Sequence, residues 1–135
     1  MPDAYVIDTD VLSYVLKGDT RAMPYQQYLL NTIVVISFMS VAELERWAIE
    51  RHWSAARRIR LRRFLDAFVT RPADRALCEA WAMIMAEARR RGTSIGHADA
   101  WIAATAFVEG LPLVTNNARH FGVVAGLTIR TEILT

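Results

Sequence analysis

The amino-acid sequence predicts an α/β fold built on a mainly parallel sheet. Short apolar, β-branched runs alternate with longer segments in which apolar residues recur at helical spacing. This alternation is typical of strand–helix–strand units, whose parallel strands are buried on both faces. The chain has 135 residues, which is enough for one domain with its own hydrophobic core. We therefore expect residues 1–135 to form a single domain.

Four segments have the composition of buried strands. Each is short, apolar and rich in Val, Ile or Leu, which favours a strand that is covered on both faces. The expected strands are residues 4–7, 33–36, 112–115 and 127–130.

The segments between the strands have helical periodicity and recognisable ends. Ser37 and Ser54 are placed to cap the helices that follow them, because a serine hydroxyl accepts a hydrogen bond from the first helical turn. Gly92 and Gly110 are placed to end helices, because glycine readily adopts the left-handed conformation found there. The expected helices are residues 9–16, 21–30, 38–52, 55–69, 74–91 and 97–109.

The composition favours a protein of the cell interior. No apolar run reaches the roughly 20 residues that cross a bilayer. The first residues lack the basic segment of a secretory signal, so we expect a cytoplasmic protein without a membrane segment. The single cysteine, Cys78, excludes an internal disulfide and a zinc site built on cysteines. Because it lies among apolar residues, we expect a buried thiol rather than a nucleophile.

Three acidic residues stand within otherwise apolar runs. Asp8 follows the first expected strand, Glu43 lies one turn into the helix after the second, and Asp99 lies in the first turn of a helix. A carboxylate in apolar surroundings is costly unless it is paired, protonated or bound to a cation. Asn117 follows the third expected strand, and the carboxyl ends of parallel strands meet at one edge of a sheet. Asp8, Glu43 and Asn117 can therefore converge at that edge.

The acids also have structural alternatives. Asp8 could cap the helix that follows it, although Asp10 could take that role and leave Asp8 free for chemistry. Glu43 could form an ion pair with one of the many arginines, and Asp99 could cap its own helix.

Two polar groups near the end of the chain are weaker candidates. Asparagine after a strand is usually a turn residue, and Asn116 competes with Asn117 for any role. His120 shows no metal-ligand spacing, so we expect a surface residue or one that supports a ligand.

All basic residues except Lys17 are arginine, and several fall between residues 57 and 63. They are interleaved with apolar residues, which predicts an amphipathic helix with a basic outer face. That face could be solvated, or it could bind RNA or a partner protein.

Four segments resemble, in order and spacing, those of the PIN-domain family, and within it the VapC-type ribonuclease toxins. They are YVIDTDVLSYVLKG from residue 5, SVAELERWA from residue 40, IGHADAWIAATA from residue 95 and LVTNNARHF from residue 113. The similarity extends over essentially the whole chain. It implies a PIN-like α/β domain whose mainly parallel sheet has about four to five strands, flanked by helices on both faces.

The resemblance implies that Asp8, Glu43 and Asp99 occupy the three acidic positions that bind Mg²⁺, which Mn²⁺ can replace. Asn117 falls on the fourth catalytic position, which is Asp or Asn in the family, and Thr115 lies two residues before it. Both are expected to help by positioning a metal-bound water or the phosphate.

Asp10 departs from the family pattern, in which Asn or Ser is frequent at this position. Its carboxylate could assist a second metal ion or cap the helix. The resemblance further implies an endoribonuclease toxin that hydrolyses phosphodiester bonds of tRNA or another structured RNA. It also implies a homodimer and a VapB-type antitoxin that neutralises the toxin.

Two other functions are compatible with parts of the sequence. A catalytically silent PIN-like module could bind RNA or a protein without cutting it. Asp8 and Asp10 after a strand also resemble the opening of haloacid-dehalogenase-like phosphatases, whose first aspartate is a nucleophile. Those enzymes need a downstream lysine and a later acidic pair. Here the only lysine is Lys17 and no acidic pair follows.

Overall fold

The computed structural model describes residues 3–132 and confirms an α/β fold with a parallel sheet. The five strands lie in the order β3-β2-β1-β4-β5, and each is parallel to its neighbours. They are β1 (Ala4–Ile7), β2 (Ile33–Ser37), β3 (Val69–Arg71), β4 (Leu113–Val114) and β5 (Ile129–Arg130). Parallel strands need crossover connections, and the helices between them provide these.

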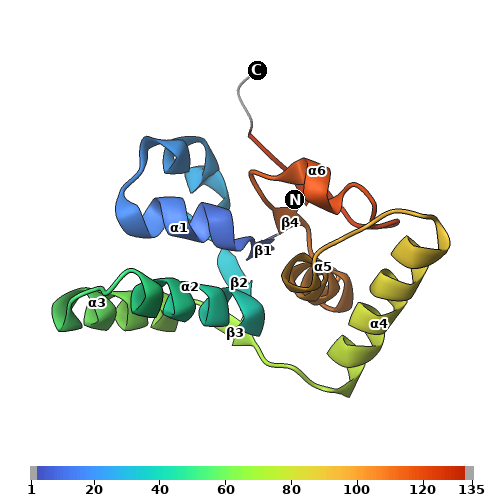
Figure 1. Cartoon of the computed structure of the whole chain (residues 1–135). Helices are drawn as coiled ribbons and strands as arrows, with labels where there is room; N and C mark the ends of the chain where they lie inside the picture. Colours follow the sequence, from blue (N-terminus) through green and yellow to red (C-terminus); the bar gives the residue numbers. More distant parts are fainter. Residues whose placement is uncertain (1–2, 133–135) are drawn as a thin grey trace.

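Helices cover both sides of the strands (Figure 1). In chain order they are α1 (Thr9–Lys17), the 3₁₀ helix η1 (Thr20–Tyr28), α2 (Phe38–Glu50), α3 (Ala55–Asp66), α4 (Arg75–Arg90), α5 (His97–Glu109) and the short α6 (Ala118–Phe121). Figure 1 shows α1, α2 and α3 on one side of the strands and α4 and α5 on the other. Within residues 3–132, no helix combines the length and the apolar character needed to span a membrane.

The two faces of the sheet pack against separate cores, because successive strand residues point to opposite faces. Tyr5 and Ile7 of β1 belong to the core formed with α1, η1, α2 and α3. Val6 between them belongs to the core formed with α4, α5 and α6. In β2, Val34 belongs to the first of these cores and Val35 to the second. The central strands β1 and β2 are therefore largely buried on both faces, as their apolar composition predicts, whereas the edge strand β3 is largely exposed.

Three elements differ from the sequence-based expectation. The expected helix 55–69 ends at Asp66, and Val69–Arg71 forms the edge strand β3. Residues 69–71 pair with β2 in place of extending the helix, and Pro72 disfavours the helical conformation at Arg71. The expected helix 21–30 is a 3₁₀ helix that contains Pro24, whose missing N–H weakens an α-helical hydrogen-bond ladder. The short helix α6 was not predicted.

The expectation of a buried thiol at Cys78 is wrong, because this side chain is exposed. Helix α4 turns Leu77 and Ala88 to the core, with Trp81 and Ile84 partly buried between them. Successive helical residues differ by roughly 100° around the axis. Cys78, which follows the buried Leu77, therefore lies on the outer face of α4.

Candidate active site

Asp8 lies where β1 ends and α1 begins, and its side chain is only 4% exposed. Its Oδ1 accepts a hydrogen bond from the Thr9 backbone N–H at 2.7 Å, so Asp8 is itself the N-cap residue of α1. Its Oδ2 accepts a hydrogen bond from Thr115 Oγ1, also at 2.7 Å. The alternative in which Asp10 caps α1 is not found, because Asp8 is the N-cap residue and Asp10 lies inside the first turn. A carboxylate can accept roughly four hydrogen bonds, so Asp8 retains capacity for a further ligand.

Asp10 connects the start of α1 to the loop after β4. Its Oδ1 accepts a hydrogen bond from the Val11 N–H at 2.7 Å, and its Oδ2 accepts one from the Asn116 N–H at 3.0 Å. The amide of Asn116 donates to Tyr14 Oη at 3.3 Å and accepts from Tyr25 Oη at 2.6 Å. Asn116 is thus fixed between α1 and η1, which is a structural role.

Glu43 projects from α2 toward the start of α1. Its Oε1 accepts a hydrogen bond from Thr9 Oγ1 at 2.8 Å, and the same hydroxyl lies 2.8 Å from Ser40 Oγ. Both Thr9 and Ser40 are buried. Among the ion pairs of residues 3–132 none involves Glu43, so the alternative of a salt bridge to an arginine is not found there.

Asp99 lies in the first turn of α5 but does not cap it. The N-cap residue is Gly96, and no side chain forms a capping hydrogen bond. The Asp99 side chain is 32% exposed, and its Oδ2 lies 3.4 Å from His120 Nδ1. Asp99 is therefore more accessible to solvent than its apolar neighbours in the sequence predict. His120, on α6, is the one histidine among residues 3–132 that lies within ion-pair distance of a site acid.

Asn117 and Thr115 lie on the segment that leaves β4. Thr115 is fully buried, and its hydroxyl both donates to Asp8 and accepts from the Asn117 N–H at 2.9 Å. Asn117 is exposed, and its side chain does not cap α6. Because Asn116 takes the structural role in this loop, the Asn117 amide is available to a ligand.

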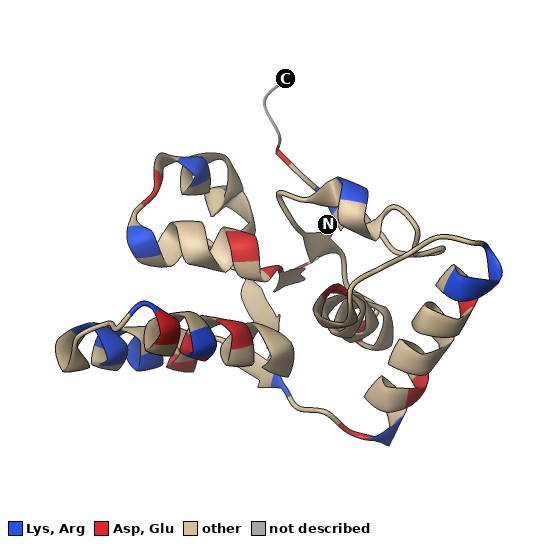
Figure 2. Cartoon of the chain, viewed as in Figure 1, with Lys and Arg blue, Asp and Glu red and all other residues tan. Residues whose placement is uncertain are grey.

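These residues come from separate elements that meet at the carboxyl edge of the sheet. Helix α2 contacts both α1 and α5. Figure 2 shows acidic residues at the start of α1, in α2 and in α5, around the end of β1. Ligands of open parallel sheets bind beyond the carboxyl ends of the strands. The position of the site thus agrees with the sequence-based expectation.

A model of the PIN domain matches residues 5–127. The chain belongs to the PIN-domain family. This membership favours the nuclease interpretation of the site over the phosphatase alternative.

Curated relatives of this PIN domain include bacterial ribonucleases. The tRNA(fMet)-specific endonuclease VapC of Shigella flexneri is 30% identical over 132 residues, which cover 95% of this chain and 96% of the relative. Ribonuclease VapC2 of Haemophilus influenzae is 30% identical over 128 residues, which likewise cover 95% and 96%.

Solved structures share the fold along nearly the whole chain. DNA-bound VapBC from Salmonella typhimurium matches with a TM-score of 0.80 and 27% identity, covering 97% of this chain and 98% of that chain. VapBC2 from Rickettsia felis, bound to a promoter DNA fragment, matches with a TM-score of 0.85 and 23% identity. That match covers 96% of this chain and 99% of the Rickettsia chain.

Three acids of this PIN domain, Asp8, Asp10 and Glu43, are desolvated. Burial, and next the charge of Asp10, raises the pKa of Asp8 well above its ordinary value, although hydrogen bonds from Thr115 and Thr9 oppose the shift. Burial also raises the pKa of Asp10 and that of Glu43. The ion pairs formed among residues 3–132 bring no lysine or arginine to these three carboxylates. Desolvated acids without a cation are the surroundings that a bound cation would stabilise.

The chemistry of the donors fits a hard divalent cation. The groups that meet here offer carboxylate, hydroxyl and amide oxygens, which Mg²⁺ and Mn²⁺ prefer. Within the described part of the chain, no three Asp, Glu, His or Cys side chains lie close enough to enclose a metal ion by themselves. A divalent ion held here would therefore complete its coordination with waters or with oxygens of a ligand.

The family resemblance pointed to Thr115, but the other two hydroxyl groups beside the acids, those of Thr9 and Ser40, were missed. Thr9 and Ser40 are polar residues inside buried segments, next to Asp8 and near Glu43. Buried hydroxyls require partners, so their positions beside the acids were a usable signal. Tyr25 carries no such signal, because it reaches the loop after β4 from 91 positions away in the chain.

Proposed function

We propose that this PIN domain is a divalent-metal-dependent endoribonuclease and the toxin of a toxin–antitoxin pair. The observation that carries the proposal is the cluster of Asp8, Glu43 and Asp99 at the carboxyl edge of the sheet, where Asp8 is buried without a basic partner among residues 3–132. Relatives that are 30% identical over nearly the full length are named as ribonucleases, which supports hydrolysis of RNA. We place this activity in the cytoplasm.

Asp8 and Asp99 are proposed as direct ligands of Mg²⁺, for which Mn²⁺ can substitute, and Glu43 as a ligand or a base that orients water. When bound, such an ion supplies a water of lowered pKa and stabilises charge on the phosphate. The chain itself holds the acids in place: Thr115 fixes Oδ2 of Asp8, and Thr9 fixes Oε1 of Glu43.

The neighbouring polar groups have different proposed roles. Asn117 is exposed at the site and positions a water or a phosphate oxygen. Both oxygens of Asp10 accept hydrogen bonds from backbone N–H groups, so Asp10 orients the loop that carries Asn116 and Asn117. This assignment makes Asp10 a positioning residue and not a metal ligand.

The proposed partners follow from the same comparisons. The similar Salmonella typhimurium structure is a VapBC complex, which supports a VapB-type antitoxin for this chain. The relative from Shigella flexneri is named as specific for tRNA(fMet), which supports tRNA or another structured RNA as the substrate class. We further propose a homodimer.

The proposal is tested by incubating the purified protein with a panel of RNAs that includes total tRNA, in Mg²⁺ and in EDTA. We expect discrete cleavage in Mg²⁺ that EDTA abolishes. Asp8→Ala should abolish cleavage while its circular dichroism spectrum remains that of a folded protein. RNA that is bound but never cut would support the catalytically silent alternative. Cleavage retained by folded Asp8→Ala would overturn the site assignment.

A further inference from the structure

Helix α3 carries the arginine run for which the sequence left three interpretations open: solvation, RNA binding or partner binding. The structure places part of this run in a shallow groove of about 620 Å³ between α3 and the last turn of α1. Lys17 lines the groove from α1, and Arg57, Arg60 and Arg63 line it from α3. The three arginines recur every third residue, so they share one face of the helix with roughly 4.5 Å of rise between neighbours.

These four cations lack acidic partners within residues 3–132. None of them takes part in an ion pair there, whereas Arg58 on another face of α3 lies 3.7 Å from Glu45. The pKa of Lys17 lies below its ordinary value because partial burial, and next the charge of Arg51 and other arginines, disfavours the ammonium.

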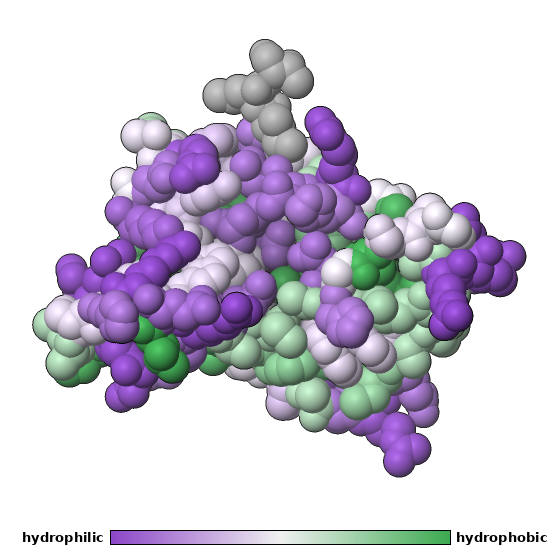
Figure 3. Space-filling view, in the orientation of Figure 1, coloured by the Kyte–Doolittle hydropathy of each residue, from purple (hydrophilic) through white to green (hydrophobic). Residues whose placement is uncertain are grey.

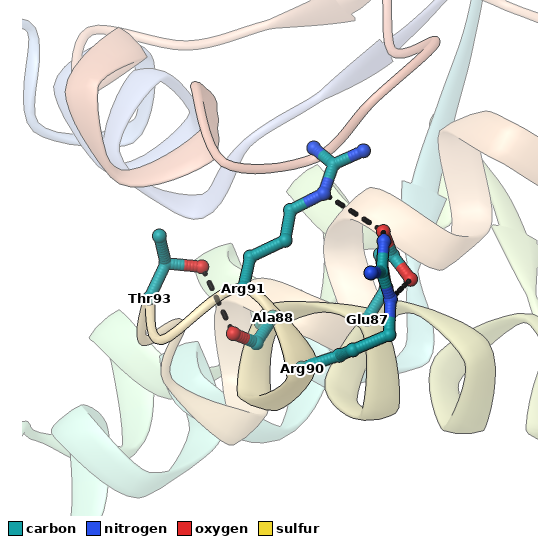
Figure 4. A network of polar contacts seen from close by, with 5 residues as sticks. All are labelled: Glu87, Ala88, Arg90, Arg91 and Thr93. Atoms are coloured by element: carbon teal, nitrogen blue, oxygen red, sulfur yellow. Dashed lines mark hydrogen bonds and ion pairs between the residues drawn. The ribbon is translucent and has the colours of Figure 1, made fainter.

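The arginines at the end of α4 show the opposite arrangement (Figure 4). Glu87 accepts hydrogen bonds from Arg90 Nε at 2.9 Å and from Arg91 Nε at 2.8 Å. Thr93 Oγ1 donates to the Ala88 carbonyl and closes the helix end beside them. Arg90 and Arg91 are thus neutralised within α4, whereas Lys17, Arg57, Arg60 and Arg63 gather around one groove without an ion pair among residues 3–132.

The groove lies at the opposite end of α1 from the acidic site. Asp8 and Lys17 mark the two ends of α1, which places them about 14 Å apart along its axis. Figure 2 shows basic residues at the far end of α1 and along α3, on the side of the molecule that Figure 3 shows as largely hydrophilic. An RNA strand with one phosphate at the acids meets their repulsion there, and cations within a few nucleotides would offset it.

We propose that the groove formed by Lys17, Arg57, Arg60 and Arg63 binds the phosphate backbone of the RNA strand beside the cleavage point. The inference rests on the proposed function, because it assumes that the RNA enters at Asp8. Binding here is independent of base identity. The groove offers guanidinium groups, which bind phosphates. The Trp53 indole is not open for base stacking, because Trp53 is 9% exposed and the Arg57 guanidinium lies 3.9 Å from the centre of its ring.

The same feature argues against a protein occupant. Protein partners are held mainly by aromatic or apolar anchors that fill central pockets. The groove aromatic Trp53 is covered by Arg57, and Phe64 packs against the core below. Val15 and Leu16 add apolar surface to the groove, but four cations line it and its aromatic rings are covered, which favours a polyanion.

The test compares two double variants that remove the same charge. Arg60→Gln with Arg63→Gln removes two of the four groove cations, and Arg62→Gln with Arg89→Gln removes two exposed arginines that do not line the groove. Gln has nearly the helix propensity of Arg, so both variants should fold. Affinity for a labelled mixed-sequence single-stranded RNA is measured in EDTA, which stops cleavage, over a series of salt concentrations.

We expect the groove variant to raise the Kd about tenfold or more at low salt. Its slope of log affinity against log salt should fall by about 1.4, because each lost contact with a single strand removes about 0.7. The control variant should stay within about twofold of wild type. Equal losses in the two variants, or none in the groove variant, would overturn the inference. So would polyglutamate that binds the wild type as tightly as RNA, since the groove would then not select a nucleic acid backbone.

The result is distinguishable from failure of the proposed function. If the wild type cuts RNA in Mg²⁺ and the groove variant binds RNA normally, only the groove assignment fails. If the wild type never cuts RNA but the groove variant loses RNA binding, only the nuclease assignment fails.

Discussion

Thr115→Val tests whether the buried hydroxyl holds the first acid of the site. Thr115 is fully buried, and its Oγ1 donates to Asp8 Oδ2 at 2.7 Å. Valine has nearly the same shape, so the substitution removes a hydrogen bond without opening a cavity. A hydrogen bond to a charged group contributes about 1.5–3 kcal/mol. The Asn117 N–H also loses its acceptor, which adds to the expected loss.

The expected loss of unfolding free energy is therefore about 2–3 kcal/mol, which is about 8–12 °C in Tm for a domain of this size. RNA cleavage should fall about tenfold or more, since Asp8 is no longer held in one orientation. Urea unfolding and initial cleavage rates measure the two effects. Thr115→Ser keeps the hydroxyl and should recover most of the activity, at a cost of about 1 kcal/mol for the lost methyl group.

Thr105→Val is the matched control. Thr105 is also fully buried, but its hydroxyl donates to the Trp101 carbonyl within α5 at 2.9 Å. We expect a loss of about 1 kcal/mol and an unchanged cleavage rate. Wild-type stability and cleavage in Thr115→Val would contradict the role of the Thr115 hydroxyl in holding Asp8. A loss of activity in Thr105→Val as large as that in Thr115→Val would contradict it as well.

Three further substitutions have distinct expected outcomes. Asp8→Asn should abolish cleavage but raise the free energy of unfolding in EDTA, because burial and the charge of Asp10 raise the pKa of Asp8. This gain in stability should grow as pH rises through the raised pKa and vanish in acid. Urea unfolding across a pH series measures it. Tyr25→Phe should cost about 1–3 kcal/mol, since the buried hydroxyl donates to Asn116 Oδ1 at 2.6 Å, and unchanged urea unfolding would contradict this. Cys78→Ser should change stability by less than about 0.5 kcal/mol, because the thiol is exposed; a larger loss would show that it is packed.

The sequence predicted elements whose signals are local. Ser37 and Ser54 are the N-cap residues of α2 and α3, as their positions before apolar helical segments indicated. Gly110 follows α5 in the left-handed conformation, with φ of 65°, which glycine adopts without strain. Strands β1 and β2 are apolar on both faces and were found with nearly the expected bounds.

Elements that depend on tertiary contacts were not predicted. Strand β3 has only Val69–Arg71 and is fixed by pairing with β2, which a local pattern does not reveal. Cys78 was misassigned because an apolar neighbourhood in sequence does not specify which face of a helix is buried.

The candidate site likewise contains residues that a local sequence signal predicts and residues that depend on tertiary contacts. The acids stand out because a carboxylate within an apolar run is unusual, and Asp8 is indeed buried. Thr115 was named only through the family resemblance, because it meets Asp8 only after β4 has paired with β1. The structural roles of Asp10 and Asn116 depend on the same pairing, since the two residues are 106 positions apart.

The most direct test of the central claim measures metal binding and cleavage in the same three proteins: wild type, Asp8→Asn and Asp66→Asn. Asp66 is an exposed acid at the end of α3 and serves as the matched control. Mn²⁺ at about 100 times its Kd should stabilise wild type and Asp66→Asn by about 2.7 kcal/mol, and both should cleave RNA. Asp8→Asn should show neither effect. Equal Mn²⁺ stabilisation and RNA cleavage by folded Asp8→Asn would contradict the assignment of this acidic cluster as the catalytic metal site.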